Sequence, residues 1–195
     1  MNEQMFSSYL SEIMKNQFPK PRESFKSLLK LKEGQDLIGA EIGVFEGINA
    51  KAILNAYPHI KLYLVDNYER VVIATGGALV PEYQKQEIMR NCERNLSCYN
   101  GRVIRVFKQS EVAYKDFLDN YFDYVYIDGE HLYDWVKRDI ELWYPKVKIG
   151  GILAGHDYEM SSVMRAVAEF RDMNNIKYFS FSTGNGESDW WFTKV

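Results

Sequence analysis

The sequence has few cysteines, no long apolar run and no excess of charge of one sign, and each absence removes a class of protein. Its two cysteines, Cys92 and Cys98, cannot form the disulfide framework of a small secreted domain, and two thiols alone make a poor metal site. The 24 Lys and Arg residues against 27 Asp and Glu residues leave a net charge of −3, so no overall basic field points to nucleic acid. No apolar run reaches the ~18 residues that a membrane-spanning helix needs, and no basic segment followed by an apolar one opens the chain. We therefore expect a cytoplasmic protein with free thiols that binds neither nucleic acid nor membranes.

The composition that remains is globular, with 46% hydrophobic residues in a chain of 195. At this length we expect one domain with a sizeable core. Residues 1–36 contain two predicted amphipathic helices, the first with Asn2 as its N-cap and the second ending near Gly34. The apolar faces of these helices consist of Phe6, Tyr9, Leu10, Ile13 and Met14, and of Phe25, Leu28 and Leu29. We expect them to form a helical cover over a larger domain at residues 37–195.

From residue 37 onward, strand-like and helix-like segments alternate. The expected strands are Leu37–Gly43, Ile60–Asp66, Arg102–Lys108, Phe122–Asp128 and Ile152–His156. The expected helices are Asn49–Ala56, Glu82–Ser97, Val112–Asn120, Leu132–Val147 and Ser161–Met173. Both cysteines are expected in the second of these helices, and the fourth should be kinked or ended by Pro145 and in any case ended by Gly150 and Gly151. Two further strand-like runs, Lys177–Ser182 and Asp189–Lys194, are joined by too few residues for a crossover helix and must pair antiparallel. The pattern predicts an α/β fold, Rossmann-like and doubly wound, with seven strands that are mostly parallel and an antiparallel hairpin strand at the C-terminus.

In such a sheet, ligands bind beyond the carboxyl ends of the strands. The first expected strand ends in the pattern E-x-G-x-x-x-G, formed by Glu41, Gly43 and Gly47. The glycines allow a tight turn and a close approach of the backbone to a ligand, while Glu41 suits a cationic ligand better than a pyrophosphate. Asp66 ends the next strand, where a carboxylate can accept both hydroxyls of a ribose. The same residues also allow a plainer interpretation, with two turn glycines and a loop cap.

The order of the motifs Glu41–Gly47, Leu62–Asp66, Ser110 and Tyr126–His131 resembles that of class I S-adenosylmethionine-dependent methyltransferases. The stretch Phe122–Tyr158 is similar to a subgroup of small-molecule O-methyltransferases that includes metal-dependent macrolide and aminocoumarin sugar methyltransferases. The resemblance covers about residues 37–195 and also implies a sheet whose last strand inserts antiparallel.

This resemblance implies a role for each matching residue. Glu41, Gly43 and Gly47 would line the methionine and ribose side of the cofactor, and Asp66 would hold the ribose hydroxyls. The adenine would be bordered by Gln109 and Ser110. Asn67 follows the ribose acid, and Asp128 bounds the methionine end.

A second group of polar residues ends the fourth and fifth expected strands. Asp128 ends one, and His156 with Asp157 ends its neighbour about 4.8 Å away, so the three side chains can converge on one ion. Two carboxylates with open positions suit Mg²⁺ or Mn²⁺. The spacing resembles that of the metal-dependent O-methyltransferases, which usually have a carboxylate where His156 stands. Without a metal, Asp128 would only border the cofactor, Asp157 would cap the next helix, and His156 would be structural.

Methyl transfer to a hydroxyl also needs a group that takes the hydroxyl proton. Glu130 and His131 directly follow Asp128, at positions where the resemblance places an acidic base in the sugar-modifying enzymes and a basic catalytic residue in other metal-dependent relatives. We favour His131, because its ordinary pKa is near neutrality. The alternative is a histidine that only holds a loop at the start of a helix.

Together these features predict an S-adenosylmethionine-dependent O-methyltransferase acting on a hydroxyl of a small molecule of sugar or natural-product type, with assistance from a divalent metal. Two other functions remain open. A nicotinamide-dependent Rossmann oxidoreductase is disfavoured by the missing third glycine and by Glu41, and a non-catalytic nucleoside-binding module by the intact set of acidic residues. The loop at residues 67–81, with Gly76 and Gly77 as hinges, is expected to close over the substrate. A homo-oligomer is compatible with the sequence.

Overall fold

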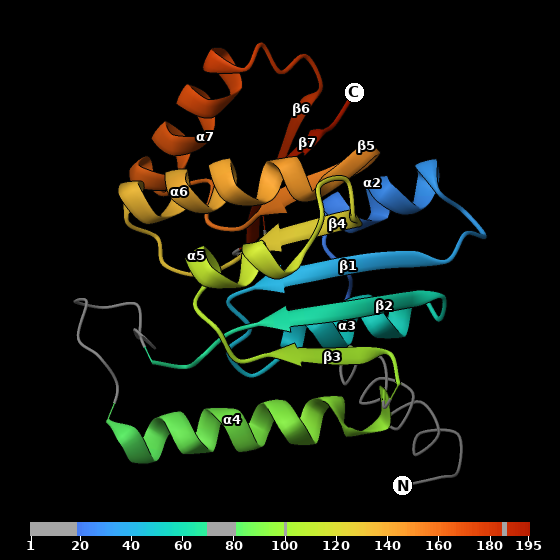
Figure 1. Cartoon of the computed structure of the whole chain (residues 1–195), viewed down its shortest axis with the longest axis vertical. Coiled ribbons are helices and arrows are strands. Elements are labelled where there is room, and N and C mark those ends of the chain that lie inside the picture. Colours follow the sequence, from blue (N-terminus) through green and yellow to red (C-terminus); the bar gives the residue numbers. More distant parts are fainter. Residues whose placement is uncertain (1–18, 70–80, 100, 185–186) are drawn as a thin grey trace, which may run out of the picture.

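The computed structural model describes residues 19–69, 81–99, 101–184 and 187–195. Within these residues, seven strands form one sheet, and helices cover both of its faces (Figure 1). The strands are β1 (Leu37–Ile42), β2 (Ile60–Val65), β3 (Val103–Val106), β4 (Phe122–Ile127), β5 (Val147–Gly155), β6 (Phe179–Gly184) and β7 (Glu187–Thr193). The helices are α2 (Glu23–Leu31), α3 (Ile48–Ala56), α4 (Glu82–Leu96), α5 (Ser110–Ala113), α6 (Tyr133–Trp143) and α7 (Ser161–Met173). Short 3₁₀ turns follow α4, α5 and α6, namely η1 (Ser97–Tyr99), η2 (Tyr114–Asp116) and η3 (Tyr144–Lys146).

The order of strands across the sheet is β3-β2-β1-β4-β5-β7-β6. Strands β1 to β5 run parallel, and β7 is inserted antiparallel between β5 and β6, with Leu153 opposite Phe192. This topology confirms the predicted mostly parallel sheet and its C-terminal hairpin strand. It also brings the carboxyl ends of β1, β2, β4 and β5 to one edge.

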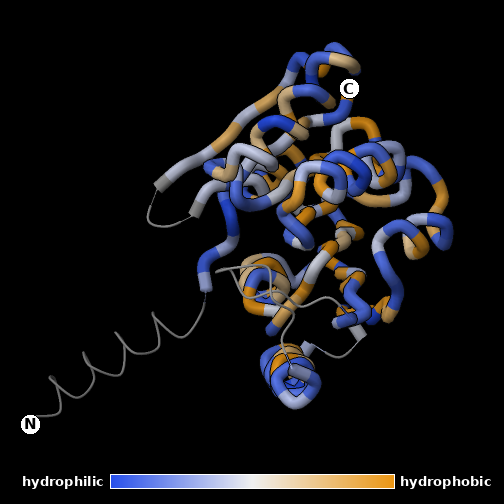
Figure 2. Tube along the Cα trace, turned by 90° about the vertical axis from the view of Figure 1, so that its left-hand side faces the viewer, coloured by the Kyte–Doolittle hydropathy of each residue, from blue (hydrophilic) through white to orange (hydrophobic). Residues whose placement is uncertain are grey.

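The core has two layers, one on each face of the sheet. Successive residues of β4 alternate between them: Val125 and Ile127 pack in the layer under α6 and α7, and Tyr124 and Tyr126 in the layer under α2 and α3. A strand buried on both faces is mostly hydrophobic at successive positions, and Glu41 in β1 and Asp123 in β4 are the buried acids that interrupt this pattern. Helix α4, at the bottom of Figure 2, mixes hydrophobic and hydrophilic residues because only one of its faces is buried.

The predicted helix Val112–Asn120 is wrong in its extent. Helix α5 ends at Ala113, η2 follows, and the backbone becomes extended at Phe117. The ring of Phe117 packs against those of Phe122 and Trp143, with centroids 4.9 and 5.9 Å away. Placing this aromatic side chain in the core ends the helix, because a continued helix would carry it elsewhere.

Three other boundaries differ from the prediction. Helix α6 stops at Trp143, and Pro145 lies in η3, so the residues after it enter β5. Gly150, expected to end a helix, has a φ of +75° inside β5, where the pairing with β4 shifts register. Cys98 lies in η1, beyond the end of α4, and is exposed, whereas Cys92 is buried in α4; both are free.

The second predicted N-terminal helix is confirmed as α2, whose Phe25 and Leu28 are fully buried in the layer that contains Tyr124. The first predicted helix with its Asn2 cap, and Gly76 and Gly77 in the predicted closing loop, lie outside the described residues. The division into residues 1–36 and 37–195 therefore stays a prediction. No helix in the described part of the chain is long and apolar enough to cross a bilayer.

Candidate functional site

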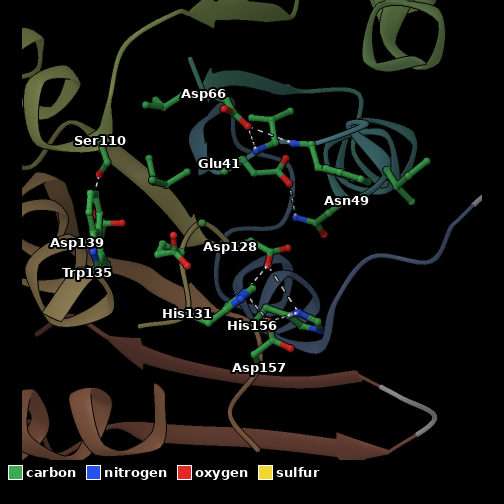
Figure 3. Close-up of a pocket in the computed structure, with 18 of the residues that line it drawn as sticks. Glu41, Asn49, Asp66, Ser110, Asp128, His131, Trp135, Asp139, His156 and Asp157 are labelled. Atoms are coloured by element: carbon green, nitrogen blue, oxygen red, sulfur yellow. Dashed lines mark hydrogen bonds and ion pairs between the residues drawn. The ribbon is translucent and has the colours of Figure 1, made fainter. Parts of the chain in front are cut away.

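A cavity of about 540 Å³ opens at the carboxyl ends of the central strands (Figure 3). Its volume is within the range of about 300–1,000 Å³ that small-molecule sites occupy. The predicted site residues that line it are Glu41, Gly43, Asp66, Asn67, Gln109, Ser110, Asp128, Glu130, His131, His156 and Asp157. The sheet topology thus brings together residues that are more than a hundred positions apart in the sequence.

The turn after β1 depends on Gly43. Its φ is +82°, and a Cβ at this position would lie 2.3 Å from the carbonyl oxygen of Asp128. Backbone therefore meets backbone where β1 and β4 end, and only glycine fits. Gly47, in contrast, lies against Leu96 and Cys92 of α4, at 2.9 and 3.0 Å from an added Cβ. It allows α3 and α4 to pack closely and is not among the residues of the cavity wall.

Asp66 holds this turn in place. Its Oδ2 accepts hydrogen bonds from the backbone N–H groups of Val44 at 2.8 Å and Phe45 at 3.2 Å, and its Oδ1 accepts one from Tyr68 at 2.8 Å. Asp66 therefore does cap the loop, as the plainer interpretation predicted. Its Oδ1 accepts a single hydrogen bond among the described residues, which leaves a lone pair for a ligand hydroxyl.

Glu41 is a buried acid with an incomplete set of donors. Its side chain is 2% exposed, Asn49 Nδ2 donates to its Oε1 at 3.2 Å, and its Oε2 has no hydrogen-bond partner among the described residues. Asn49 Oδ1 is likewise buried without a donor in that part of the chain. Burial, and then the charge of Asp128, raise the pKa of Glu41 well above its usual range. A ligand with a positive charge and N–H donors would stabilise both oxygens.

On the opposite wall, Ser110 begins α5 and contacts two residues of α6. The indole Nε1 of Trp143 donates to Ser110 Oγ at 2.8 Å, and the Ser110 hydroxyl donates to Asp139 Oδ1 at 2.6 Å. Gln109 Nε2 donates to Glu69 Oε2 at 2.8 Å. Asp139 also lines the cavity, and the sequence analysis missed it. The signal that could have found it is a lone acid on the apolar face of α6, between Val136 and Ile140.

Between these walls, four side chains form a cluster (Figure 3). His131 Nε2 lies 2.7 Å from Asp157 Oδ2 and 4.0 Å from Asp128 Oδ1. His156 Nδ1 lies 3.3 Å from Asp157 Oδ2 and 3.6 Å from Asp128 Oδ1. The predicted ligand set of Asp128, His156 and Asp157 is therefore brought together. The three residues whose ligand atoms all lie within 4.8 Å of one another are Asp128, His131 and Asp157, so His131 stands at the position of a third ligand.

The carboxylates decide the charge of His131. Its interactions with Asp128, and then with Asp157, raise its pKa from the ordinary value of 6.5 to about 10. Burial alone would raise the pKa of Asp157, but its contacts with His131 and His156 hold it well below its usual range. His131 is thus a cation near neutral pH. The sequence analysis favoured it as the base on the assumption that its pKa is the ordinary value.

The donor set of this cluster fits a divalent cation. It offers two carboxylates and the imidazole of His131, whose ligand atoms all lie within 4.8 Å of one another. Mg²⁺ prefers oxygen ligands, and imidazole adds suitability for Mn²⁺ and other first-row transition metals.

Comparison with known proteins agrees with this geometry. Residues 40–158 match a family model described as "Methyltransferase domain". The chain is 28% identical over 130 residues to an uncharacterized protein, R132, of Acanthamoeba polyphaga mimivirus, a match that spans 65% of this chain and 54% of that relative. The chain thus corresponds to about half the length of this curated relative.

Several solved structures are similar at low identity. The O-methyltransferase NovP is 18% identical with a TM-score of 0.61, covering 89% of this chain and 78% of NovP. An S-adenosylmethionine-dependent O-methyltransferase of Thermotoga maritima is 13% identical with a TM-score of 0.64, covering 94% and 70%. Precorrin-6y C5,15-methyltransferase of Geobacter metallireducens is 15% identical with a TM-score of 0.60, covering 92% and 94%. At such identities the similarity shows the fold. Because the family model spans more than half of the chain, the protein belongs to the methyltransferase domain family, with the class I fold of S-adenosylmethionine-dependent methyltransferases.

Proposed function

We propose that this protein transfers the methyl group of S-adenosylmethionine to a hydroxyl of a small molecule of sugar or natural-product type, with the help of a divalent cation. The observation that carries the proposal is a single cavity bounded by the turn after β1 on one side and by the cluster of Asp128, His131 and Asp157 on the other. Family membership supports methyl transfer. Oxygen as the acceptor atom is supported by NovP and the Thermotoga protein, both described as O-methyltransferases.

The first wall of the cavity suits the cationic methionine end of the cofactor. Glu41 Oε2 and Asn49 Oδ1 are buried acceptors without donors among the described residues, and an ammonium group supplies N–H donors together with a positive charge. Asp66 would receive a ribose hydroxyl through Oδ1, while its Oδ2 keeps the turn closed. The cofactor would then extend toward Gln109 and Ser110, which would border the adenine.

Methyl transfer to oxygen needs an in-line approach and removal of the hydroxyl proton. Glu130 and His131 both line the cavity. His131 can accept a proton only in its neutral form, and its pKa of about 10 makes that form scarce near pH 7. Glu130 is therefore the candidate base while the ion pairs of His131 are intact, and His131 takes the role only where another positive charge displaces its proton.

Asp128 and Asp157 would hold the divalent cation, with His131 or His156 as a further ligand. When bound, such a cation lowers the pKa of a coordinated hydroxyl and orients it. Asp157 is suited to this role because its neighbouring imidazoles keep it ionised. Its φ of +55° is an uncommon conformation for a residue with a side chain, although aspartate tolerates it better than most.

Calorimetric titration tests this proposal directly. We expect S-adenosylmethionine and S-adenosylhomocysteine to bind, and NAD not to bind, with and without Mg²⁺ or Mn²⁺. Asp66→Ala should weaken binding by about 1–3 kcal/mol, the range for hydrogen bonds to a charged group. Tight NAD binding without a response to the sulfonium compound would overturn the proposal.

A second assay follows methyl transfer to a panel of hydroxylated small molecules. Transfer that a chelator abolishes and Mn²⁺ or Mg²⁺ restores is expected. Transfer that the chelator leaves undiminished would remove the metal from the proposal. Cofactor binding without any turnover across the panel would instead favour a non-catalytic nucleoside-binding module.

A further inference from the structure

The two edge strands of the sheet differ in how they are protected against pairing with another chain. Strand β3 forms one edge and β6 the other (Figure 1). Strand β3 has four residues, and its Arg105 pairs with Glu93 of α4 at 2.9 Å and donates to Cys92 Sγ at 3.1 Å. Short edge strands and charged residues are devices that prevent pairing. Strand β6 has six residues, with the sequence FSFSTG, and contains neither a charged residue nor a proline.

The pairing of β6 with β7 shows which backbone groups of β6 face outward. The N–H of Thr193 donates to the carbonyl oxygen of Tyr178 at 3.0 Å, which continues the register of the two strands by one pair. In an antiparallel pair, residues that exchange hydrogen bonds alternate with residues that do not. Ser180 and Ser182 therefore direct their backbone groups to β7, as Tyr178 does. The residues of β6 whose N–H and C=O groups point to the outer edge, where no strand of the described residues lies, are Phe179, Phe181 and Thr183.

The same residues carry a row of aromatic rings. Phe179 and Phe181 are two positions apart and so lie on one face of β6, with their ring centroids 6.1 Å apart. The ring of Tyr158 lies 5.3 Å from that of Phe181 and 5.7 Å from that of Phe179. Phe181 is nevertheless 56% exposed. Aromatic residues are enriched at interfaces between proteins, so this row is suited to be covered by another chain.

The two ends of β6 carry opposite charges. At its start, Lys177 is exposed, and the guanidinium of Arg171 lies 5.4 Å from the first ring of the strand. Asp172 pairs with Arg171 at 2.8 Å, so this end keeps a net positive charge. At the other end, the backbone N–H of Glu159 donates to the residue of β7 that lies opposite Thr183. An antiparallel copy of β6 would place its start beside the end of this one, so that positive and negative charges meet.

We infer that β6 pairs antiparallel with β6 of a second copy of this chain, about a twofold axis at Phe181. Phe181 of each copy then lies opposite Phe181 of the other, and Phe179 lies opposite Thr183. All outward N–H and C=O groups of these three residues find partners, and the aromatic rows of the two copies join on one face. The two seven-stranded sheets become one sheet of fourteen strands with a self-complementary interface.

The size of the contact predicts its strength. Strand β6 has six residues and spans about 20 Å. A standard interface buries about 800 Å² on each partner, more than one paired strand with its row of rings supplies. We therefore expect monomer and dimer to exchange at micromolar concentrations.

Sedimentation of the full chain over the micromolar range tests the pairing. The wild-type protein should form a dimer as its concentration rises. Phe181→Lys should weaken the dimer by about 30-fold or more, because it removes a central aromatic residue and sets two like charges opposite each other.

Tyr83→Lys is the matched control. Tyr83 is an aromatic residue of similar exposure, 65%, but it lies on α4, far from β6 in the order of the sheet. This variant should dimerise as the wild type does. A dimer that Phe181→Lys leaves as stable as the wild type would show that another surface forms it, and would overturn the inference. A wild-type protein that stays monomeric at every concentration would also overturn it, and would leave the edge to a partner of another kind.

Disulfide cross-linking tests the register and does not depend on Phe181→Lys. Phe181→Cys and Ser182→Cys are each made together with Cys98→Ser, because Cys98 is an exposed free thiol. Directly opposite residues that exchange hydrogen bonds have Cα atoms about 5.5 Å apart, a distance that a disulfide spans. Under mild oxidation, Phe181→Cys should therefore form a covalent dimer and Ser182→Cys, whose side chain lies on the other face, should form little. Equal cross-linking of both variants, or preferential cross-linking of Ser182→Cys, would overturn the twofold pairing at Phe181.

Discussion

The buried acids at the two ends of the central strands differ in how many hydrogen-bond donors surround them. At the amino end, Asp123 accepts hydrogen bonds from the backbone N–H of Ile38 at 3.0 Å and from Lys148 and Lys32 at 2.8 and 3.4 Å. At the carboxyl end, Glu41 is buried to the same degree, yet Asn49 is its one donor among the described residues, and its Oε2 receives no hydrogen bond from them. Native proteins normally pair their buried polar groups, so an incomplete set at one end marks the place where a ligand completes it.

The glycines at the two ends of β1 show the same difference. Gly34 and Gly43 both have positive φ, +76° and +82°. An added Cβ would meet no atom within 4 Å at Gly34, but would lie 2.3 Å from the Asp128 carbonyl oxygen at Gly43. The amino end therefore needs only a turn, while the carboxyl end needs a turn packed against another strand end. We expect changes at the amino end to affect stability and changes at the carboxyl end to affect ligand binding as well.

The largest expected effect is that of Gly43→Ala. The positive φ and the backbone clash together should lower the free energy of unfolding by about 3 kcal/mol or more, and cofactor binding should be lost. The control, Gly34→Ala, carries the backbone strain alone and should lose about 1–2 kcal/mol. Urea denaturation of both variants measures the difference. Equal losses would show that the packing of the turn against Asp128 does not matter.

The second-largest expected effect is that of Asp123→Ala, which should lower the free energy of unfolding by about 2–4 kcal/mol. The change leaves Lys32 and Lys148 without their acid and removes an acceptor from the Ile38 N–H. Affinity for S-adenosylhomocysteine should stay as in the wild type, because this end of the sheet is away from the cavity. Denaturation and calorimetry check the two halves of this prediction, and a loss of affinity in a folded variant would contradict the contrast between the two ends.

Glu41→Gln should show the opposite pattern, with stability kept and affinity for the ligand reduced. Removing a charge from a buried site with an incomplete set of donors should leave stability unchanged or slightly higher. The affinity for S-adenosylhomocysteine should fall about tenfold, since a charged hydrogen bond to the ligand is lost. Calorimetry on the variant at a temperature well below unfolding gives the affinity. A variant that binds as tightly as the wild type would remove Glu41 from the cofactor site.

The smallest expected effect is a dependence of stability on pH. The pKa of His131 is about 10 in the folded protein against 6.5 ordinarily, so its ion pairs stabilise fully below about pH 6.5 and this contribution is lost as the pH rises toward 10. The Tm of the wild type should therefore fall between pH 7 and 10, by a modest amount because the side chain is 41% exposed.

His131→Asn should flatten this part of the pH profile of the Tm. His59→Asn is the control at the amino end, where the side chain is 60% exposed, and it should leave the profile unchanged. An identical profile in the wild type and His131→Asn would show that the contacts of His131 with Asp128 and Asp157 contribute no stability.

The fold and the edge of the sheet that carries the site were predictable because they depend on local patterns. Alternating strands and helices predict a parallel sheet, and parallel strands end at one edge, so residues such as Glu41 and Asp157 had to meet there. The helix that ends early at Ala113 was not predictable, since the packing of Phe117 against Trp143 is a contact between distant residues.

Two features of the site depend on three-dimensional contacts in the same way. The spacing of residues places His131 near Asp128, but it cannot show that the imidazole lies 2.7 Å from Asp157 and so carries a charge. The sequence marks Asp139 only as a lone acid on the apolar face of α6, and its hydrogen bond with Ser110 becomes known only from the fold. Motifs therefore locate the site, whereas the charge states and the hydrogen bonds within it require the fold.

A crystal structure with S-adenosylhomocysteine and Mn²⁺ tests the central claim most directly, namely that one cavity holds both the cofactor and the reacting groups. We predict the homocysteine end against Glu41 and Asn49, the adenine beside Ser110 and Asp139, and an anomalous peak for manganese between Asp128 and Asp157. Density for the ligand outside this cavity, or an empty cavity at saturating ligand, would contradict the account.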